Sequence, residues 1–249
     1  MNETTLIERQ LADGVLTLRM NRPEKKNALN RAMYGALAEA LEGANADEAV
    51  RAVLLLGGEG HFSSGNDIAD FAGFDAKAGL AEVLRFLHAL VDLEKPLVAG
   101  VDGLAVGIGT TVLFHCDLAY ATPRSSFRTP FLDLGLVPEA GSSLLAPGLM
   151  GYQRAFALLV LGEALSAEEA LAAGLLVSVG DDAETLALKA AARLATKPPE
   201  ALRIARRLIR GDGAAVRVRI GEEATAFAER LVSAEARAAF AAFFDRRAH

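Results

Sequence analysis

Residues 94–109 have the sequence EKPLVAGVDGLAVGIG, and this stretch decides the fold class. It opens with the apolar run 97–101, which is typical of a strand buried on both faces. The glycine-rich part from Gly103 to Gly109 predicts the start of a helix, where free N–H groups and the positive end of the helix dipole gather. The stretch therefore predicts a buried strand that leads into a glycine-rich helix start.

Strands and helices alternate on both sides of this stretch. Apolar runs or apolar–polar alternation predict strands at residues 15–20, 53–56, 97–101 and 118–121. Leucine or methionine recurs every four residues after Asn30, which predicts an amphipathic helix over residues 30–42 with Asn30 as its cap. A second helix is predicted over residues 77–93. Such alternation predicts an α/β core with mainly parallel, buried strands.

Beyond about residue 182 the sequence pattern is wholly helical. Helices are predicted over residues 183–195, 199–210, 214–232 and 234–246. Their apolar side chains exceed what small isolated helices can hide, so they pack on the core or on a partner subunit. The sequence thus predicts a core over residues 1–181 and a helical region over residues 182–249. That region is either a cap on its own chain or an oligomer-forming domain.

Composition excludes several classes of protein. The 249 residues include 26 Lys and Arg against 32 Asp and Glu, and this net charge of −6 argues against a nucleic-acid-binding surface. The single cysteine, Cys116, excludes an internal disulfide framework and a multi-cysteine zinc site. No signal peptide is recognisable, and no apolar stretch approaches the roughly 20 residues that span a bilayer. We expect a soluble, cytoplasmic protein that binds neither nucleic acid nor membrane.

Motifs for common cofactors are absent from the sequence. The glycines at 107 and 109 lack the third glycine of a dinucleotide-binding fingerprint, because Val112 stands in its place. Neither a phosphate-binding loop nor a nucleophile elbow is present. The histidines show no metal-ligand spacing, and His115 is interpreted with Cys116 as a core residue. We therefore expect no metal and no tightly bound cofactor.

A second segment able to do chemistry is FSSGNDI, at residues 62–68. Glycine at position 65 lets the backbone approach a ligand closely and leaves the N–H of Asn66 free to point into a cleft. The simpler alternative is an ordinary polar turn.

A third such segment is FRTPFLDLGLVPEAGSS, at residues 127–143. It sets the carboxylate of Glu139 between a proline and a turn of small residues, in apolar surroundings. Glu139 either acts in chemistry or caps the next helix, and Ser142 and Ser143 are interpreted as caps of that helix rather than nucleophiles.

In this order and spacing the three segments resemble the enoyl-CoA hydratase/isomerase family, also called the crotonase family. The resemblance extends from residues 21–23 (NRP) and 27–30 (NALN) to residues 227–231 (FAERL) and covers nearly the whole chain. It implies an α/β fold, the crotonase (ClpP-like) spiral of ββα units, with a C-terminal helical region that forms trimers. It also implies acyl-CoA thioester substrates, a role in fatty acid metabolism, and homotrimers or hexamers built as dimers of trimers.

The resemblance assigns an oxyanion hole to the backbone N–H groups of Asn66 and Ile108. Removal of a thioester α-proton requires that the enolate oxygen be stabilised as charge develops. Preorganised backbone donors provide this, and loss of one typically costs about 10²–10³ in rate. Because the donors are peptide groups, the side chains at these two positions are free to vary.

The resemblance also places coenzyme A beside the N-terminal motif at residues 21–30. Candidate contacts to the coenzyme are Arg22, Lys25, Lys26 and Ser64. The alternative for the two lysines is that they are solvated surface charges. Phe71, Phe74 and Phe114 line the acyl pocket or belong to the core.

Two positions depart from the hydratases of this family, which use two glutamates to hold and activate water. The matching residues here are Thr111 and Phe131, and neither can act as a carboxylate base. Glu139 lies where the Δ3,Δ2-enoyl-CoA isomerase branch has its single catalytic acid/base. The resemblance therefore implies that Glu139 removes the C2 proton of a 3-enoyl-CoA and returns it at C4. Two alternatives stay open: an enoyl-CoA hydratase of fatty-acid β-oxidation, and a non-catalytic acyl-CoA-binding protein.

Overall fold

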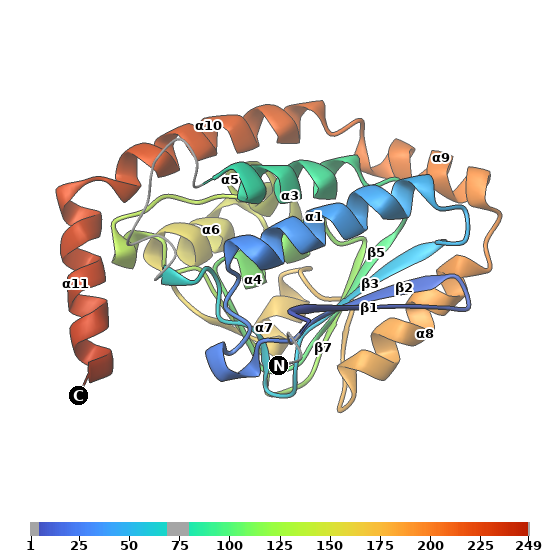
Figure 1. Ribbon diagram of the computed structural model, residues 1–249, viewed down its shortest axis with the longest axis horizontal. Coiled ribbons are helices and arrows are strands. Elements are labelled where there is room, and N and C mark those ends of the chain that lie inside the picture. Colours follow the sequence, from blue (N-terminus) through green and yellow to red (C-terminus); the bar gives the residue numbers. More distant parts are fainter. Residues whose placement is uncertain (1–4, 69–79, 249) are drawn as a thin grey trace.

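The computed structural model describes residues 5–68 and 80–248, and helices wrap two β-sheets in it (Figure 1). The larger sheet has six strands in the order β1-β2-β3-β5-β7-β10, and the smaller has four in the order β4-β6-β8-β9. The strands are β1 Ile7–Ala12, β2 Val15–Met20, β3 Ala52–Leu56, β4 His61–Ser63, β5 Leu97–Val101, β6 Leu104–Val106, β7 Leu118–Ala121, β8 Ser126–Arg128, β9 Leu165–Ser166 and β10 Ser178–Val179. Only the pairs β1–β2 and β8–β9 are antiparallel among these.

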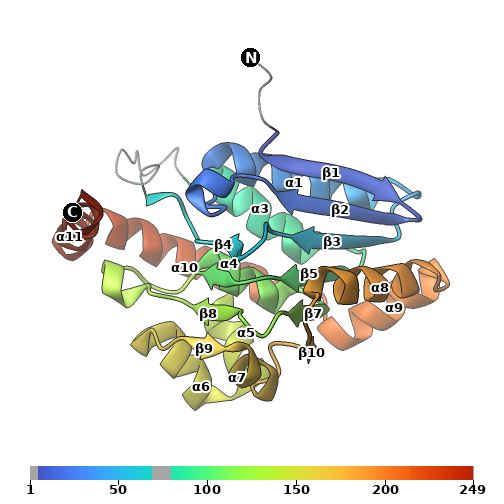
Figure 2. The same ribbon diagram turned by 90° about the horizontal axis from the view of Figure 1, so that it is seen from below.

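From β3 to β8, successive strands alternate between the two sheets. β3, β5 and β7 lie side by side in the larger sheet, and each is followed along the chain by a strand of the smaller sheet, β4, β6 or β8. Figure 2 shows these strand pairs as successive layers. This arrangement is the spiral of ββα units, and the α/β fold class predicted from the sequence is confirmed.

The strands predicted at residues 15–20, 53–56, 97–101 and 118–121 are confirmed as β2, β3, β5 and β7 of the larger sheet. Two of them, β3 and β5, are buried along their whole length, as predicted. The helix start predicted in the glycine-rich part from Gly103 to Gly109 is confirmed, because helix α4 (Ile108–Thr111) begins there. The sequence did not predict the short strand before it: Leu104 begins β6, which pairs with β4 and β8. The three residues of β6 are too few to show the alternation by which a strand is recognised in sequence.

The helices lie outside the sheets. They are α1 Arg31–Ala46, α3 Ala81–Asp92, α4 Ile108–Thr111, α5 Ser142–Met150, α6 Tyr152–Phe156, α7 Ala167–Ala172, α8 Ala183–Ala195, α9 Pro199–Arg210, α10 Ala214–Leu231 and α11 Ala234–Ala248, with 3₁₀ turns at Pro23–Lys25, Val112–His115 and Leu132–Leu134 and a π-helical turn at Ala157–Leu161. Asn30 caps α1 as predicted, because its side-chain oxygen accepts a hydrogen bond from the N–H of Met33 at 2.9 Å. The helix predicted over residues 77–93 begins outside the described residues.

The C-terminal helices pack on the core of their own chain. Helix α8 covers one face of the larger sheet, where Ala187 and Ala191 meet the apolar side chains of β3 and β5. Helix α10 crosses over α3 and α5 (Figure 1), and its Phe227 and Leu231 are buried in the main core together with Phe240 of α11. The predicted boundary after residue 181 falls between β10 and α8.

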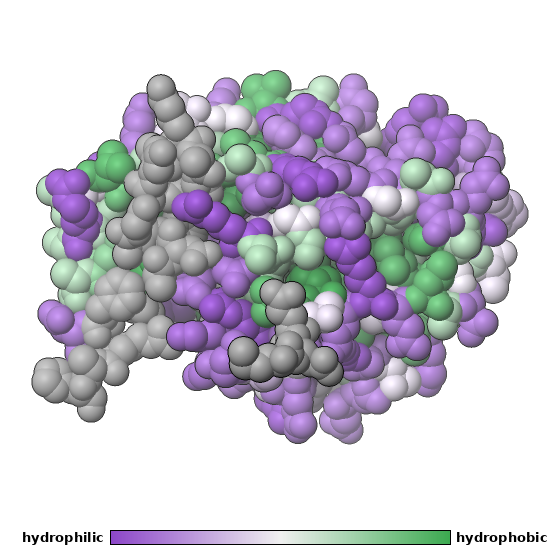
Figure 3. Space-filling model, viewed as in Figure 1, coloured by the Kyte–Doolittle hydropathy of each residue, from purple (hydrophilic) through white to green (hydrophobic). Residues whose placement is uncertain are grey.

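Hydrophilic side chains cover most of the face seen in Figure 3, with smaller apolar areas between them. Among the described residues, no helix is both long enough and apolar enough to cross a membrane.

Candidate active site

Three loops that carry the candidate residues leave the same edge of the smaller sheet. β4, β6 and β8 pair in parallel, so their carboxyl ends lie together. β4 leads to Asn66, β6 leads to Ile108, and β8 leads to the loop that carries Glu139. The structure therefore brings together three segments that are far apart in the sequence.

Two glycines allow the first two loops to approach each other. Gly65 has a φ of +91°, and a Cβ atom there would lie 2.9 Å from the carbonyl oxygen of Val106. Gly107 has a φ of +55°, and a Cβ atom there would lie 3.9 Å from the Cα atom of Gly65. Glycine adopts such conformations at no steric cost and permits this close backbone contact.

Among the described residues, the N–H groups of Asn66 and Ile108 are free. Leu29 donates to the carbonyl of Gly65 and accepts from the N–H of Asp67, so this pairing engages the residues on either side of Asn66. Ile108 is the first residue of α4, where an N–H has no acceptor within the helix. Neither N–H has a hydrogen-bond acceptor within the described residues. Two such donors can stabilise a negatively charged oxygen.

Side chains from the N-terminal part hold the Asn66 turn. The hydroxyl of Tyr34, a buried residue of α1, donates to the side-chain oxygen of Asn66. Arg22 donates to Asp67 at 2.7 Å and to the carbonyl of Ala28 at 3.0 Å. The guanidinium of Arg22, a candidate coenzyme contact, is thus engaged in an ion pair inside the protein.

The other candidate coenzyme contacts surround Ser64. Its N–H donates to the carbonyl of Lys26 at 2.9 Å, and its hydroxyl donates to the carbonyl of Lys25 at 3.0 Å. Both lysines are exposed, and Ser64 lines the larger of two cavities at the site. The turn that carries the lysines therefore lies against the wall of that cavity.

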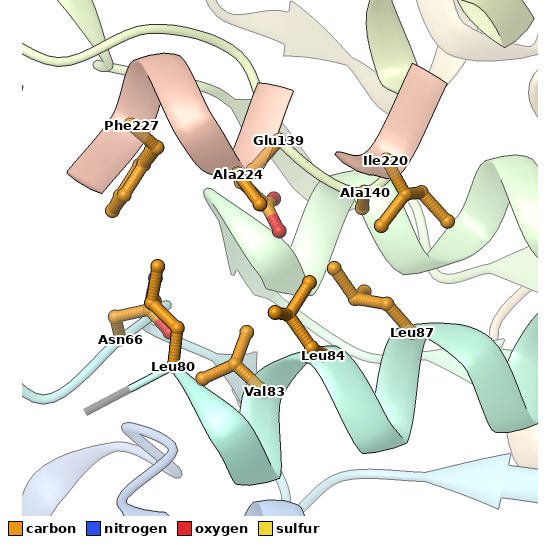
Figure 4. Close-up of a pocket in the computed structure, with 10 residues that line it drawn as sticks. All are labelled: Asn66, Leu80, Val83, Leu84, Leu87, Glu139, Ala140, Ile220, Ala224 and Phe227. Atoms are coloured by element: carbon orange, nitrogen blue, oxygen red, sulfur yellow. The ribbon is translucent and has the colours of Figure 1, made fainter. Parts of the chain in front are cut away.

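Asn66 lies between two cavities. The larger, of about 730 Å³, also contacts Gly107 and Phe131. The smaller lies between α3 and α10, has a volume of about 20 Å³, and is lined by mostly apolar side chains around Glu139 (Figure 4). Phe227 of α10 lines both cavities. Asn66 and Phe227 therefore lie between the larger cavity and the small cavity that Glu139 lines.

Glu139 is buried, with 7% of its surface exposed. One oxygen, Oε1, accepts a hydrogen bond from the hydroxyl of Thr111 at 2.5 Å, and Oε2 has no partner within the described residues. In Figure 4 the carboxyl points into the small cavity, between α3 and α10. Burial raises the pKa of Glu139 to about 8, the charge of Glu223 adds to this rise, and the Thr111 hydrogen bond opposes it. Such a carboxyl can take up and release a proton near neutral pH.

The predicted helix caps after Glu139 are wrong. Gly141 occupies the cap position of α5, the hydroxyl of Ser142 has no partner within the described residues, and that of Ser143 donates to Glu223. Glu223 of α10 accepts hydrogen bonds from the N–H groups of Gly141 and Ser143 and therefore caps the N-terminus of α5. Nothing local in the sequence marks this residue, because it lies about 80 positions away.

The remaining predicted residues are spread around the site. Phe131 is buried, and Phe114 is half-buried against the main core. Phe71 and Phe74 lie outside the described residues. Tyr34 and Phe227 were not predicted as site residues, since each lies on an ordinary apolar helix face. Among the described residues, no three His, Cys, Asp or Glu side chains are grouped as metal ligands.

Comparison with known proteins gives consistent matches. The family model for enoyl-CoA hydratase/isomerase matches residues 10–248. Enoyl-CoA delta isomerase 2 from Homo sapiens is 40% identical over 210 residues, which are 80% of this chain and 52% of that protein. The 2,3-dehydroadipyl-CoA hydratase from Escherichia coli (strain K12) is 31% identical over 237 residues, 94% of this chain and 93% of that protein.

Among solved structures, the enoyl-CoA hydratase/isomerase from Pseudoalteromonas atlantica T6c matches with a TM-score of 0.92 at 43% identity. The match covers 97% of this chain and 98% of that chain. By contrast, the chain spans only 52–65% of the length of the enoyl-CoA delta isomerases that it matches.

Gly65→Ala tests the contact between the two glycine turns. Because the new Cβ would lie 2.9 Å from a backbone oxygen, we expect a loss of stability beyond the about 1–3 kcal/mol that positive-φ strain alone costs. Gly60→Ala is the matched control, since Gly60 has a φ of +73° but nothing within 4 Å of its Cβ position. Denaturant unfolding measures both free energies, and equal losses would show that the contact is not tight.

The pKa of Glu139 predicts how stability depends on pH. The ordinary value is 4.5 and the folded value is about 8, so between these limits unfolding releases a proton and the unfolding free energy falls as pH rises. The limiting slope is about 1.4 kcal/mol per pH unit. Glu139→Gln should remove this loss, so its stability relative to the wild type should rise from pH 5 to pH 8. A difference between the two proteins that does not change with pH would contradict the buried-carboxyl interpretation.

Proposed function

Because the chain belongs to the enoyl-CoA hydratase/isomerase family, also called the crotonase family, we propose that it acts on acyl-CoA thioesters and converts a 3-enoyl-CoA to a 2-enoyl-CoA. The family indicated by the sequence segments is thereby confirmed. The proposal is carried by one observation: the buried carboxyl of Glu139 faces a cavity that also contacts Asn66, beside the two free N–H groups.

The thioester oxygen is bound by the N–H groups of Asn66 and Ile108. Removal of a C2 proton converts the thioester into a dienolate, whose negative charge resides largely on that oxygen. The two donors are held by backbone geometry before the reaction starts, so they stabilise the charge without reorganisation. This arrangement favours any reaction that passes through a thioester enolate.

Glu139 transfers the proton. In its ionised form it removes the C2 proton, becomes a neutral carboxylic acid, and returns the proton at C4. Its pKa of about 8 supports both halves of this cycle near neutral pH, because the two forms are then close in free energy. Thr111 holds one carboxyl oxygen and leaves the other, Oε2, free to carry the proton.

The surroundings of Glu139 favour proton transfer over hydration. The small cavity is lined mostly by apolar side chains, which offer a water molecule few hydrogen-bond partners. Thr111 and Phe131 stand where hydratases of the family place their two glutamates, so the means of activating water are missing. Similarity to a named hydratase keeps hydration as the second candidate function.

The coenzyme occupies the larger cavity, with Lys25 and Lys26 near its wall to meet the phosphates. The reaction requires no metal and no cofactor besides the coenzyme A of the substrate. Exposed apolar side chains on α6 and α9, including Tyr152, Leu208 and Ile209, support assembly into a homotrimer or hexamer.

The proposal predicts that Glu139→Gln loses isomerase activity. With 3-hexenoyl-CoA we expect the rate to fall by about 10² or more, because the amide cannot accept the C2 proton. In the wild type, kcat/KM should rise with pH and level off above about 8, where Glu139 is ionised. Double-bond migration and the hydration of crotonyl-CoA are followed separately for both proteins, with Glu229→Gln as a control expected to match the wild type.

Other outcomes identify the alternatives. Crotonyl-CoA hydration that exceeds isomerisation tenfold or more would overturn the proposal in favour of a hydratase. Acyl-CoA binding without turnover, unchanged in Glu139→Gln, would indicate a non-catalytic binding protein.

A further inference from the structure

The peptide group that joins Ala140 to Gly141 is held at both of its ends. Nε2 of His115 lies 2.7 Å from the carbonyl oxygen of Ala140. The N–H of Gly141 donates to Oε2 of Glu223 at 2.5 Å. His115 ends the 3₁₀ turn after α4, and Glu223 lies on α10, so two distant parts of the chain hold a single peptide group directly after Glu139.

This peptide group has an uncommon conformation. Ala140 has a φ of +61° and Gly141 a φ of +70°, so two consecutive residues adopt left-handed backbone angles. A residue with a Cβ atom rarely does so, because the atom crowds the following carbonyl. Rotation of the peptide would relieve this crowding at Ala140 and would also move the backbone of Glu139. The two hydrogen bonds oppose that rotation.

The hydrogen-bonding role of His115 is fixed by its neighbours. A carbonyl oxygen only accepts, so Nε2 carries the proton and Nδ1 carries the lone pair. Burial lowers the pKa of His115 to about 4, which keeps the ring neutral. Arg210 at the end of α9 places a guanidinium nitrogen 3.4 Å from Nδ1, which favours the tautomer that donates from Nε2.

Glu223 binds Ser143 as well as Gly141. Its Oε1 accepts from the N–H of Ser143 at 3.0 Å and from the hydroxyl of that serine at 2.6 Å. Arg219 on the same helix donates to the same hydroxyl at 3.1 Å. Glu223 is only 7% exposed, and its charge lies at the N-terminus of α5, where a negative charge is favoured. This carboxylate therefore fixes the whole turn between Glu139 and α5.

We propose that His115 and Glu223 are positioning residues, which hold the Ala140–Gly141 peptide so that the carboxyl of Glu139 stays aimed at the reacting carbon atoms. The role rests on the proposed function, since it concerns the residue that transfers the proton. Neither residue lines the cavities around Glu139, and both hold it through the backbone. The charge of Glu223 also raises the pKa of Glu139, whereas neutral His115 acts by position alone, so the His115 variants isolate the positioning role.

The test uses the full-length protein, 3-hexenoyl-CoA and three variants. In Glu223→Gln one carboxylate oxygen becomes an amide nitrogen that cannot accept, and in His115→Phe the donor is lost while the ring remains. For both we expect kcat to fall about tenfold to 100-fold, the scale of a small misplacement, with KM within twofold of the wild type. His115→Gln keeps an N–H donor and should recover much of kcat.

Glu229→Gln is the matched control for Glu223→Gln. It makes the same change on the same helix at an exposed position, and we expect wild-type kcat and KM. Hydrogen–deuterium exchange over residues 139–145 gives a readout independent of the reaction, and exchange should accelerate in Glu223→Gln and His115→Phe but not in the control. If Glu223→Gln does not fold, the positioning role is tested by comparing kcat of His115→Phe with kcat of His115→Gln.

The outcomes separate the two proposals. Folded Glu223→Gln and His115→Phe proteins that keep kcat within twofold would overturn the positioning role, as would an equal loss in His115→Phe and His115→Gln. A wild type that does not isomerise 3-hexenoyl-CoA would instead overturn the proposed function. In that case hydrogen–deuterium exchange still tests the positioning role. Exchange over residues 139–145 that is the same in Glu223→Gln, His115→Phe and the wild type would overturn it.

Discussion

The parallel pairing of β4, β6 and β8 is the constraint on which the rest of the site depends. Each of these strands is only three residues long. Each follows a longer strand of the larger sheet along the chain, and that strand fixes its position. The registers of β3, β5 and β7 therefore determine which loops meet at the edge of the smaller sheet. The two free N–H groups and Glu139 owe their proximity to a buried sheet that none of them belongs to.

The site concentrates two features that oppose folding. The first is a carboxyl group removed from water, with one oxygen unpaired among the described residues. The second is the left-handed backbone of Ala140 directly beside it. Both features are typical of functional sites, where the surrounding structure holds groups in states that they would not adopt alone. The apolar packing of α3 and α10 around Glu139 provides that support here.

The sequence predicted four of the six strands of the larger sheet, because runs such as residues 53–56 and 97–101 are apolar and bounded by glycine or proline. It did not predict the short strands of the smaller sheet, since β4 and β8 contain serine or arginine and are too short to show periodicity. The candidate residues Asn66, Ile108 and Glu139 were selected by the resemblance of their segments, not by any local rule. The contacts of Glu223 and His115 depend on how distant helices pack, and no pattern of neighbouring residues records such packing.

The wall that buries Glu139 is made late in synthesis, because Glu223 lies 82 residues beyond Gly141 and Phe227 lies further still. Until α10 is in place, Glu139 therefore lacks part of the apolar wall whose burial raises its pKa. The same holds for a protein truncated before α10, which would keep the strands that define the fold and lose the burial that shifts the pKa of Glu139. The raised pKa of Glu139 thus depends on a helix that follows every strand of the fold along the chain.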